Sequence, residues 1–139
     1  MTDHPMAVEF VISRLDEVRQ VQADIKEALQ AHQFDDRDLF SIELALEEAL
    51  VNAIKYGNQL DPAKRVFVRY DLTPERFEIR IEDEGPGFDP GDVPDPTLPE
   101  NLDRPCGRGL FLIRRFMTDV TYHGKGNVVT MSKVRAASE

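Results

Sequence analysis

Three clusters in this 139-residue chain carry residue types suited to binding a ligand. On a predicted long helix, Glu48, Asn52 and Lys55 share one stripe, because residues three or four apart on a helix face the same way. A solvated helix face is the simplest interpretation of the charged members. Asn52 fits it less well, since asparagine is a poor helix former and this one stands among small apolar residues. A mid-helix asparagine in such surroundings often has a specific partner.

The second cluster follows a predicted strand. Successive side chains of a strand point to opposite faces, so Asp83 faces the same side as Ile79 and Ile81, toward the core. An unpaired buried carboxylate is costly. Asp83 therefore either caps the turn that follows it or accepts a hydrogen bond from an amino group of a ligand. Gly85 and Gly87 would then let the backbone come close to that ligand.

The third cluster, Cys106-Gly107-Arg108-Gly109-Leu110, opens another predicted helix. Two glycines leave the first amides of the helix open, at the end that carries partial positive charge. Phosphate binds readily at such an end. A plain change from loop to helix also uses glycine, so this cluster alone is a weak indication of a binding site.

Hydrophobic periodicity predicts the elements that must position these clusters. In the long helix the apolar residues recur at spacings of three and four, as in a core-facing seam made of Leu39, Ile42, Leu46, Ala49 and Ala53. A shorter helix around residues 18–29 shows the same spacing. Residues 66–72 and 77–82 alternate apolar and polar side chains, which predicts a hairpin with one dry face.

The other elements complete an alternating order. Asp35-Asp36 should cap the long helix, and Gly57-Asn58 should end it. The remaining predicted elements are a strand at 7–12, a helix at 109–117, and strands at 118–123 and 127–134. This order predicts an α+β fold, a two-layer sandwich in which a mainly antiparallel mixed sheet carries its helices on one face. We expect a single domain over residues 1–139, with its core at about 7–134.

Composition narrows the class of protein. The net charge of −9 repels phosphate backbones and argues against nucleic acid as the main partner. The single Cys106 excludes a disulfide framework, and with no signal-peptide pattern at the start it predicts a cytoplasmic protein. No apolar stretch approaches the ~20 residues of a membrane span, so no membrane partner is expected.

Taken in order along the chain, the three clusters resemble a known set of motifs. A helix with Glu-x-x-x-Asn, a strand ending Asp-x-Gly-x-Gly, a proline-rich stretch and a Gly-x-Gly helix start are similar to the N, G1 and G2 boxes of the GHKL ATPases, whose ATP site is the Bergerat fold. The resemblance spans about residues 7–134. Within that superfamily, residues 40–49, 107–113 and 117–120 look like the anti-sigma-factor serine/threonine kinases of bacterial partner-switching systems.

The resemblance implies a role for each site residue. Glu48 would be the general base that takes the proton from a serine or threonine hydroxyl. Asn52 would bind Mg²⁺ through its amide oxygen, and Lys55 would add a cation beside the phosphates. Asp83 would accept a hydrogen bond from the exocyclic amine of adenine. The backbone amides that hold the phosphates would be those of Gly107, Arg108, Gly109 and Leu110.

The resemblance also assigns the stretch that follows Asp83. Gly85 and Gly87 would let the chain pass under the base, and residues 88–106 would form the ATP lid. Two positions depart from the family pattern. Pro105 stands where the family often has arginine or another polar residue, with Arg104 displaced by one position, which leaves its contact with phosphate open. Gly126-Asn127 replaces the usual Gly-Thr and is given no ligand role.

The function that the resemblance implies is an ATP- and Mg²⁺-dependent protein serine/threonine kinase. It would act as an anti-sigma factor or similar partner-switching regulator that phosphorylates a STAS-type antagonist, with a sigma factor as a further partner and a homodimer as its assembly. A nucleotide-gated binding module that transfers no phosphate is the alternative from another class. Two other readings are disfavoured: the catalytic half of a histidine kinase, which would need a phosphoacceptor hairpin, and a gyrase-like or MutL-like ATPase, which would need a transducer domain.

Overall fold

Five strands of the chain form one sheet. The computed structural model describes residues 8–85, 113–124 and 127–135. The strands lie in the order β1-β2-β3-β5-β4, and every neighbouring pair among them is antiparallel. Their bounds are β1 (Val8–Ile12), β2 (Val66–Leu72), β3 (Arg76–Asp83), β4 (Asp119–His123) and β5 (Val128–Val134).

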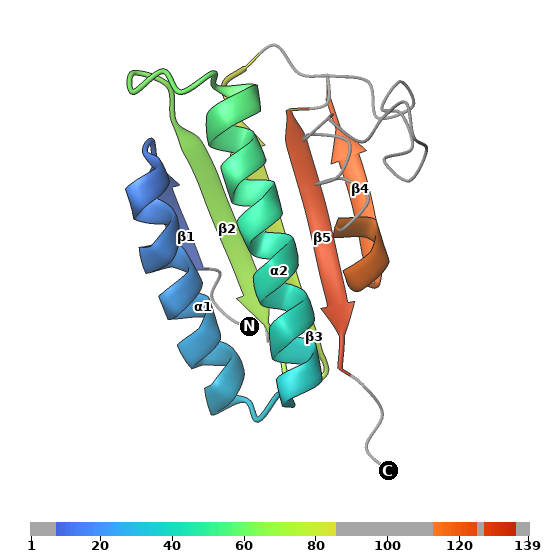
Figure 1. The fold of residues 1–139 in the computed structure, drawn as a ribbon. Helices are drawn as coiled ribbons and strands as arrows, with labels where there is room; N and C mark the ends of the chain where they lie inside the picture. The colour runs from blue at the N-terminus through green and yellow to red at the C-terminus, as the bar shows by residue number, and fades with distance from the viewer. Residues whose placement is uncertain (1–7, 86–112, 125–126, 136–139) are drawn as a thin grey trace, which may run out of the picture.

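Two long helices cover one face of the sheet, which confirms the predicted two-layer α+β fold (Figure 1). A short 3-10 turn, η1 (Leu15–Glu17), leads into α1 (Val18–Ala31). The second helix, α2 (Asp36–Asn52), continues without a break into a π-helical turn, η2 (Ala53–Gly57). Residues 113–116 are also helical, and Ile113 and Met117 bury their side chains in the core.

Apolar side chains between the helices and the sheet form the core. The predicted seam of α2 is confirmed, because all five of its residues are buried. In β3 the burial alternates as predicted: Phe77, Ile79 and Ile81 are buried, whereas Arg76 and Arg80 are exposed. Burying one such side chain contributes about 1.5–3 kcal/mol. This interface therefore fixes α2 against β3, the two elements that carry Asn52 and Asp83.

The start of α2 depends on one capping side chain. The Asp35 carboxylate accepts a hydrogen bond from the Asp38 amide at 2.8 Å, so Asp35 is the N-cap within the predicted pair. Asp35→Ala leaves that amide without its partner and is expected to lower the free energy of unfolding by about 1 kcal/mol. Urea unfolding followed by circular dichroism measures the loss. Asp36→Ala removes a neighbouring exposed carboxylate that makes no capping bond, so an equal loss in both variants would contradict the assignment.

The structure differs from the sequence-based predictions at several points. No parallel pair occurs among the described strands, so the sheet is simpler than the mixed sheet expected. The last two strands begin one residue later than predicted, at Asp119 and Val128. Asn52 was placed in the middle of a helix, but it is the last α-helical residue before the π turn. Of the helix predicted at 109–117, the part before residue 113 lies outside the described residues.

Candidate functional site

The carboxyl end of α2 carries two half-buried polar side chains, Glu48 and Asn52. Burial raises the pKa of the Glu48 carboxyl above its ordinary value, and the charge of Glu47 raises it further. Within the part of the chain that the structure describes, neither side chain has a hydrogen-bond or ion-pair partner. Their four-residue spacing places both on one stripe of the helix, as the sequence predicted. This stripe can therefore present a carboxylate and an amide to a ligand.

The π turn η2 shifts the backbone just after Asn52. The Asn58 amide donates to the Ala53 carbonyl at 2.8 Å, a bond that spans five residues instead of the four of an α-helix. Turns of this kind are frequently found at functional sites. Lys55 and Tyr56 are both exposed, and the Lys55 ammonium lies 5.7 Å from the centre of the Tyr56 ring. The predicted cation is thus placed on the turn itself.

Asp83 ends β3 and is half-buried, on the face of the sheet that carries the buried residues of that strand. The Gly85 amide donates to its Oδ1 at 2.8 Å, so the turn-capping alternative is realised through that oxygen. Its backbone is fixed by Asn127, because the Asp83 amide donates to the Asn127 carbonyl at 2.9 Å and the Asn127 side chain donates to the Asp83 carbonyl at 3.0 Å. The carboxylate is therefore held in one orientation.

Gly57 and Gly85 bring the π turn and the end of β3 into direct contact. A Cβ on Gly57 would lie 2.4 Å from Oδ2 of Asp83, and a Cβ on Gly85 would lie 1.8 Å from the Gly57 carbonyl oxygen. Both distances are far shorter than any real carbon contact. Only glycine at both positions lets Asp83 sit against the turn that follows Asn52.

Two alanine substitutions separate the effects of this contact. Gly85→Ala collides with backbone, so we expect it to lower the free energy of unfolding by about 1–3 kcal/mol. Gly57→Ala collides with the end of a side chain, which can turn away, so its main expected effect is weaker nucleotide binding through a displaced Asp83. Thermal unfolding and calorimetric titration with ATP measure the two effects. The assignment fails if Gly57→Ala binds ATP as the unchanged chain does.

The structure brings part of the predicted site together. Asp83 and Gly85 lie against the turn that extends α2 beyond Glu48 and Asn52. Gly87, the predicted lid at 88–106 and the predicted phosphate-binding amides lie outside the described residues; those amides belong to Gly107, Arg108, Gly109 and Leu110. No group of His, Cys, Asp or Glu side chains that could bind a metal occurs among the described residues. The role of Asn52 as a metal ligand stays a prediction.

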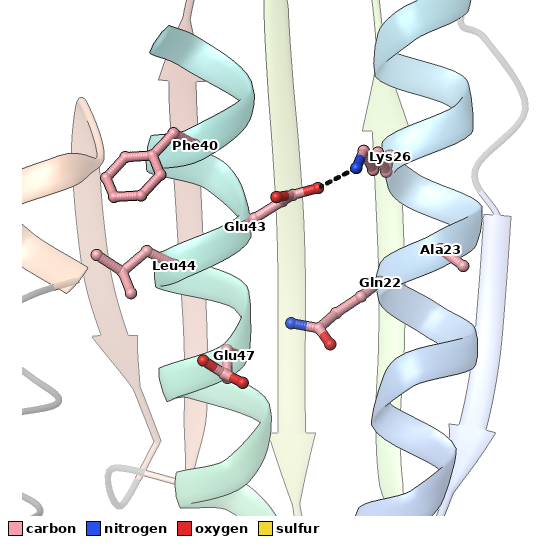
Figure 2. Close-up of a pocket in the computed structure, with 7 residues that line it drawn as sticks. All are labelled: Gln22, Ala23, Lys26, Phe40, Glu43, Leu44 and Glu47. Carbon is pink, nitrogen blue, oxygen red and sulfur yellow. Dashed lines mark ion pairs between the residues drawn. The ribbon is translucent and has the colours of Figure 1, made fainter. Parts of the chain in front are cut away.

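A groove of about 360 Å³ runs between the outer surfaces of α1 and α2 (Figure 2). Lys26 and Glu43 face each other across it, with 3.7 Å between Nζ and Oε1. Phe40 also lines it, with its ring on the side of α2 away from α1, and the residue is 60% exposed. The groove contains none of the predicted nucleotide-binding residues. Glu47 links the groove to these residues, because it lines the groove and its charge raises the pKa of Glu48.

Comparison with known proteins identifies the fold and the family. Residues 11–133 match the family described as the histidine kinase-like ATPase domain. The chain belongs to this ATPase family. The predicted resemblance to the GHKL ATPases is therefore confirmed, and the match covers the end of β1, both long helices, strand β3 with Asp83, and Asn127 just before β5.

Several relatives of this ATPase domain are bacterial proteins named serine-protein kinase RsbW. The Listeria monocytogenes protein is 30% identical over 102 residues, which cover 66% of this chain and 63% of that protein. The Bacillus cereus protein is 32% identical over 108 residues, which cover 69% and 64%. The match with the Oceanobacillus iheyensis protein is 27% identical and covers 76% and 72%. The chain thus spans somewhat under two thirds of the first and second of these relatives.

A solved structure has the same fold. The crystal structure of the RsbU and RsbW domains of a Mycobacterium tuberculosis protein superposes with a TM-score of 0.61 over 94% of this chain and 32% of that chain. Sequence identity is 15%, so this likeness concerns the fold alone.

Within the described part of the ATPase domain, no helix is both long and apolar enough to cross a membrane.

Proposed function

We propose that this chain is an ATP-dependent protein serine kinase that acts as an anti-sigma factor or a similar partner-switching regulator. The observation that carries the proposal is Glu48, a half-buried carboxyl with a raised pKa and no partner among the described residues, one helical turn before Asn52. A carboxylate of raised pKa at this place can take the proton of an attacking hydroxyl. The relatives named serine-protein kinase support the same reaction.

In the proposed site, the Asp83 carboxylate, oriented by the Gly85 amide, accepts a hydrogen bond from the adenine amine. The phosphates extend toward Asn52 and the amides predicted at residues 107–110. Lys55 is exposed one turn beyond Asn52 and can move over the phosphates. Each of these contacts is one the residue type makes well: carboxylate with amine, and cation or amide with phosphate.

In the proposed reaction, a serine hydroxyl of the protein substrate attacks the γ-phosphorus, and the bond from that phosphorus to the bridging oxygen of ADP breaks. Glu48 takes the hydroxyl proton. Its raised pKa suits this, because a more basic carboxylate accepts a proton more readily. The amide oxygen of Asn52, which has no partner among the described residues, fits Mg²⁺, which prefers oxygen ligands and would neutralise phosphate charge.

The proposed partners are a STAS-domain antagonist as the phosphate acceptor and a sigma factor as the protein released by the switch. A homodimer is the proposed assembly. We place the kinase in the cytoplasm, where both ATP and such partners are found. All four statements rest on the resemblance to the anti-sigma kinases.

The proposal is tested by incubating the chain with radiolabelled ATP, Mg²⁺ and the STAS-domain protein encoded nearest to its gene. We expect label on a serine of that protein, and none when the acceptor serine is replaced by alanine. Mass spectrometry locates the phosphate. Nucleotide-dependent binding of the STAS protein without any transfer of label would instead establish the gated binding module.

A further inference from the structure

Asn58, directly after the π turn, ties three segments of the chain together. Its side chain is 1% exposed. The side-chain amide donates to the Arg65 carbonyl at 3.1 Å, just before β2, and its oxygen accepts from the Glu84 amide at 2.8 Å, just after β3. Its backbone amide closes the π turn on Ala53. One buried residue thus joins the end of the α2 helical run to the beginning of one strand and the end of another.

The bond to Glu84 leads directly to the predicted base-binding carboxylate. Glu84 precedes Gly85, whose amide donates to Oδ1 of Asp83. The position of the Gly85 amide therefore depends on the bond that Asn58 makes to the residue before it. Glu84 is fixed a second time, because its carboxylate accepts from the Arg65 amide at 2.6 Å. The two strands and the turn form a closed set of hydrogen bonds around Asn58.

We infer that Asn58 is a positioning residue for recognition of the base: it orients the Asp83 carboxylate, through Glu84 and Gly85, relative to the helix end that carries Asn52. The inference rests on the proposed function, because it takes Asp83 as the acceptor for the adenine amine. Asn58 touches no part of the nucleotide in this arrangement. Its effect should appear in how well the site distinguishes a base with the amine from one without it.

The test compares the dissociation constants of ATP and purine riboside triphosphate, which lacks only the exocyclic amine. Losing a hydrogen bond to a charged group weakens binding about tenfold or more, so the unchanged chain should prefer ATP by that ratio. Asn58→Ala is expected to reduce the ratio to about twofold, since a carboxylate displaced by a fraction of an ångström makes a poorer bond. Calorimetry with each nucleotide needs no protein partner.

Matched variants separate positioning from simple destabilisation. Asn58→Asp keeps an oxygen for the Glu84 amide but sets a buried carboxylate oxygen against the Arg65 carbonyl, so it should lose stability and keep the preference for ATP. Asp61→Ala removes a bond to the Ala63 amide in the same loop and should also keep the preference. If Asn58→Ala does not fold, Asn58→Ser takes its place, because the shorter hydroxyl cannot span to Glu84.

The outcomes are distinct. Loss of the preference in Asn58→Ala or Asn58→Ser alone supports the inference. An unchanged preference in that variant, or an equal loss in Asp61→Ala, overturns it and leaves the proposed kinase standing. Equal binding of the two nucleotides by the unchanged chain overturns both this inference and the role of Asp83.

Discussion

Glu48→Gln is expected to lower the rate of phosphoryl transfer to the protein substrate by about 10²–10⁴-fold while ATP affinity stays the same. Glutamine is nearly the same size as glutamate and cannot take the hydroxyl proton. Removing a group that acts only in the transition state lowers the turnover rate and leaves the affinity for bound ATP unchanged. Single-turnover transfer of labelled phosphate and calorimetric titration with ATP measure the two quantities. A rate equal to that of the unchanged chain would contradict the role of Glu48 as the base.

Glu47→Gln is the matched control, because it removes the neighbouring carboxylate on the groove side of α2. Transfer should continue at neutral pH. The charge of Glu47 raises the pKa of Glu48, so removing it lowers that pKa, and the base stays ionised at more acidic pH. The acidic limb of the rate profile should therefore move to lower pH. Movement to higher pH would contradict the electrostatic coupling.

The raised pKa of Glu48 also makes the stability of the fold depend on pH. A carboxyl whose pKa is raised in the folded state favours folding at low pH, and this contribution is lost as the pH rises through the folded-state pKa. Above that pKa the ionised Glu48 thus disfavours the folded state. Glu48→Gln removes this cost and should unfold at the same temperature or higher, although it has lost transfer.

Asp83→Asn is expected to weaken ATP binding about 10- to 150-fold, the largest loss of affinity among single substitutions at the site. The oxygen of asparagine can still accept from the Gly85 amide, so the turn should remain. Its amino group, however, replaces an acceptor with a donor facing the adenine amine, which also donates. Calorimetry with ATP measures the loss, and circular dichroism checks that the fold is intact.

Glu82→Gln is the control for this substitution. It removes the same charge one residue earlier, from a side chain that points to the opposite face of β3 and pairs with Arg80 at 3.0 Å. ATP affinity should not change in this variant. Equal weakening in both variants would mean that net charge, and not the position of Asp83, governs binding.

Local patterns predicted most of the fold. The α2 seam, the Asp35 cap and the alternation in β3 each depend on residues within a few positions of one another, and all three are confirmed. The orientation of Asp83 toward the core also followed from strand alternation. The sequence left open whether its carboxylate caps a turn or meets a ligand; the structure adds the turn-capping bond, and the ligand contact stays a prediction.

The features that escaped prediction depend on contacts between distant parts of the chain. Asn58 was assigned only as part of a helix end, yet its partner Glu84 lies 26 residues further on. Asn127 was given no ligand role, and its side chain binds the Asp83 carbonyl 44 residues earlier. Asparagine at a helix end or in a turn is common, and only the bonds to the end of β3 distinguish these two.

The π turn has a consequence for how this chain can change during evolution. A turn closed over five residues is equivalent to a single-residue insertion in an α-helix. Deleting one residue from 53–57 would restore regular α-helical bonding and rotate everything after it by about 100°. Gly57 would then no longer lie against the Asp83 carboxylate, and a residue with a side chain would stand in its position. Surface loops commonly accept gains and losses of residues, but homologues that share this site should align through this helix end without a gap.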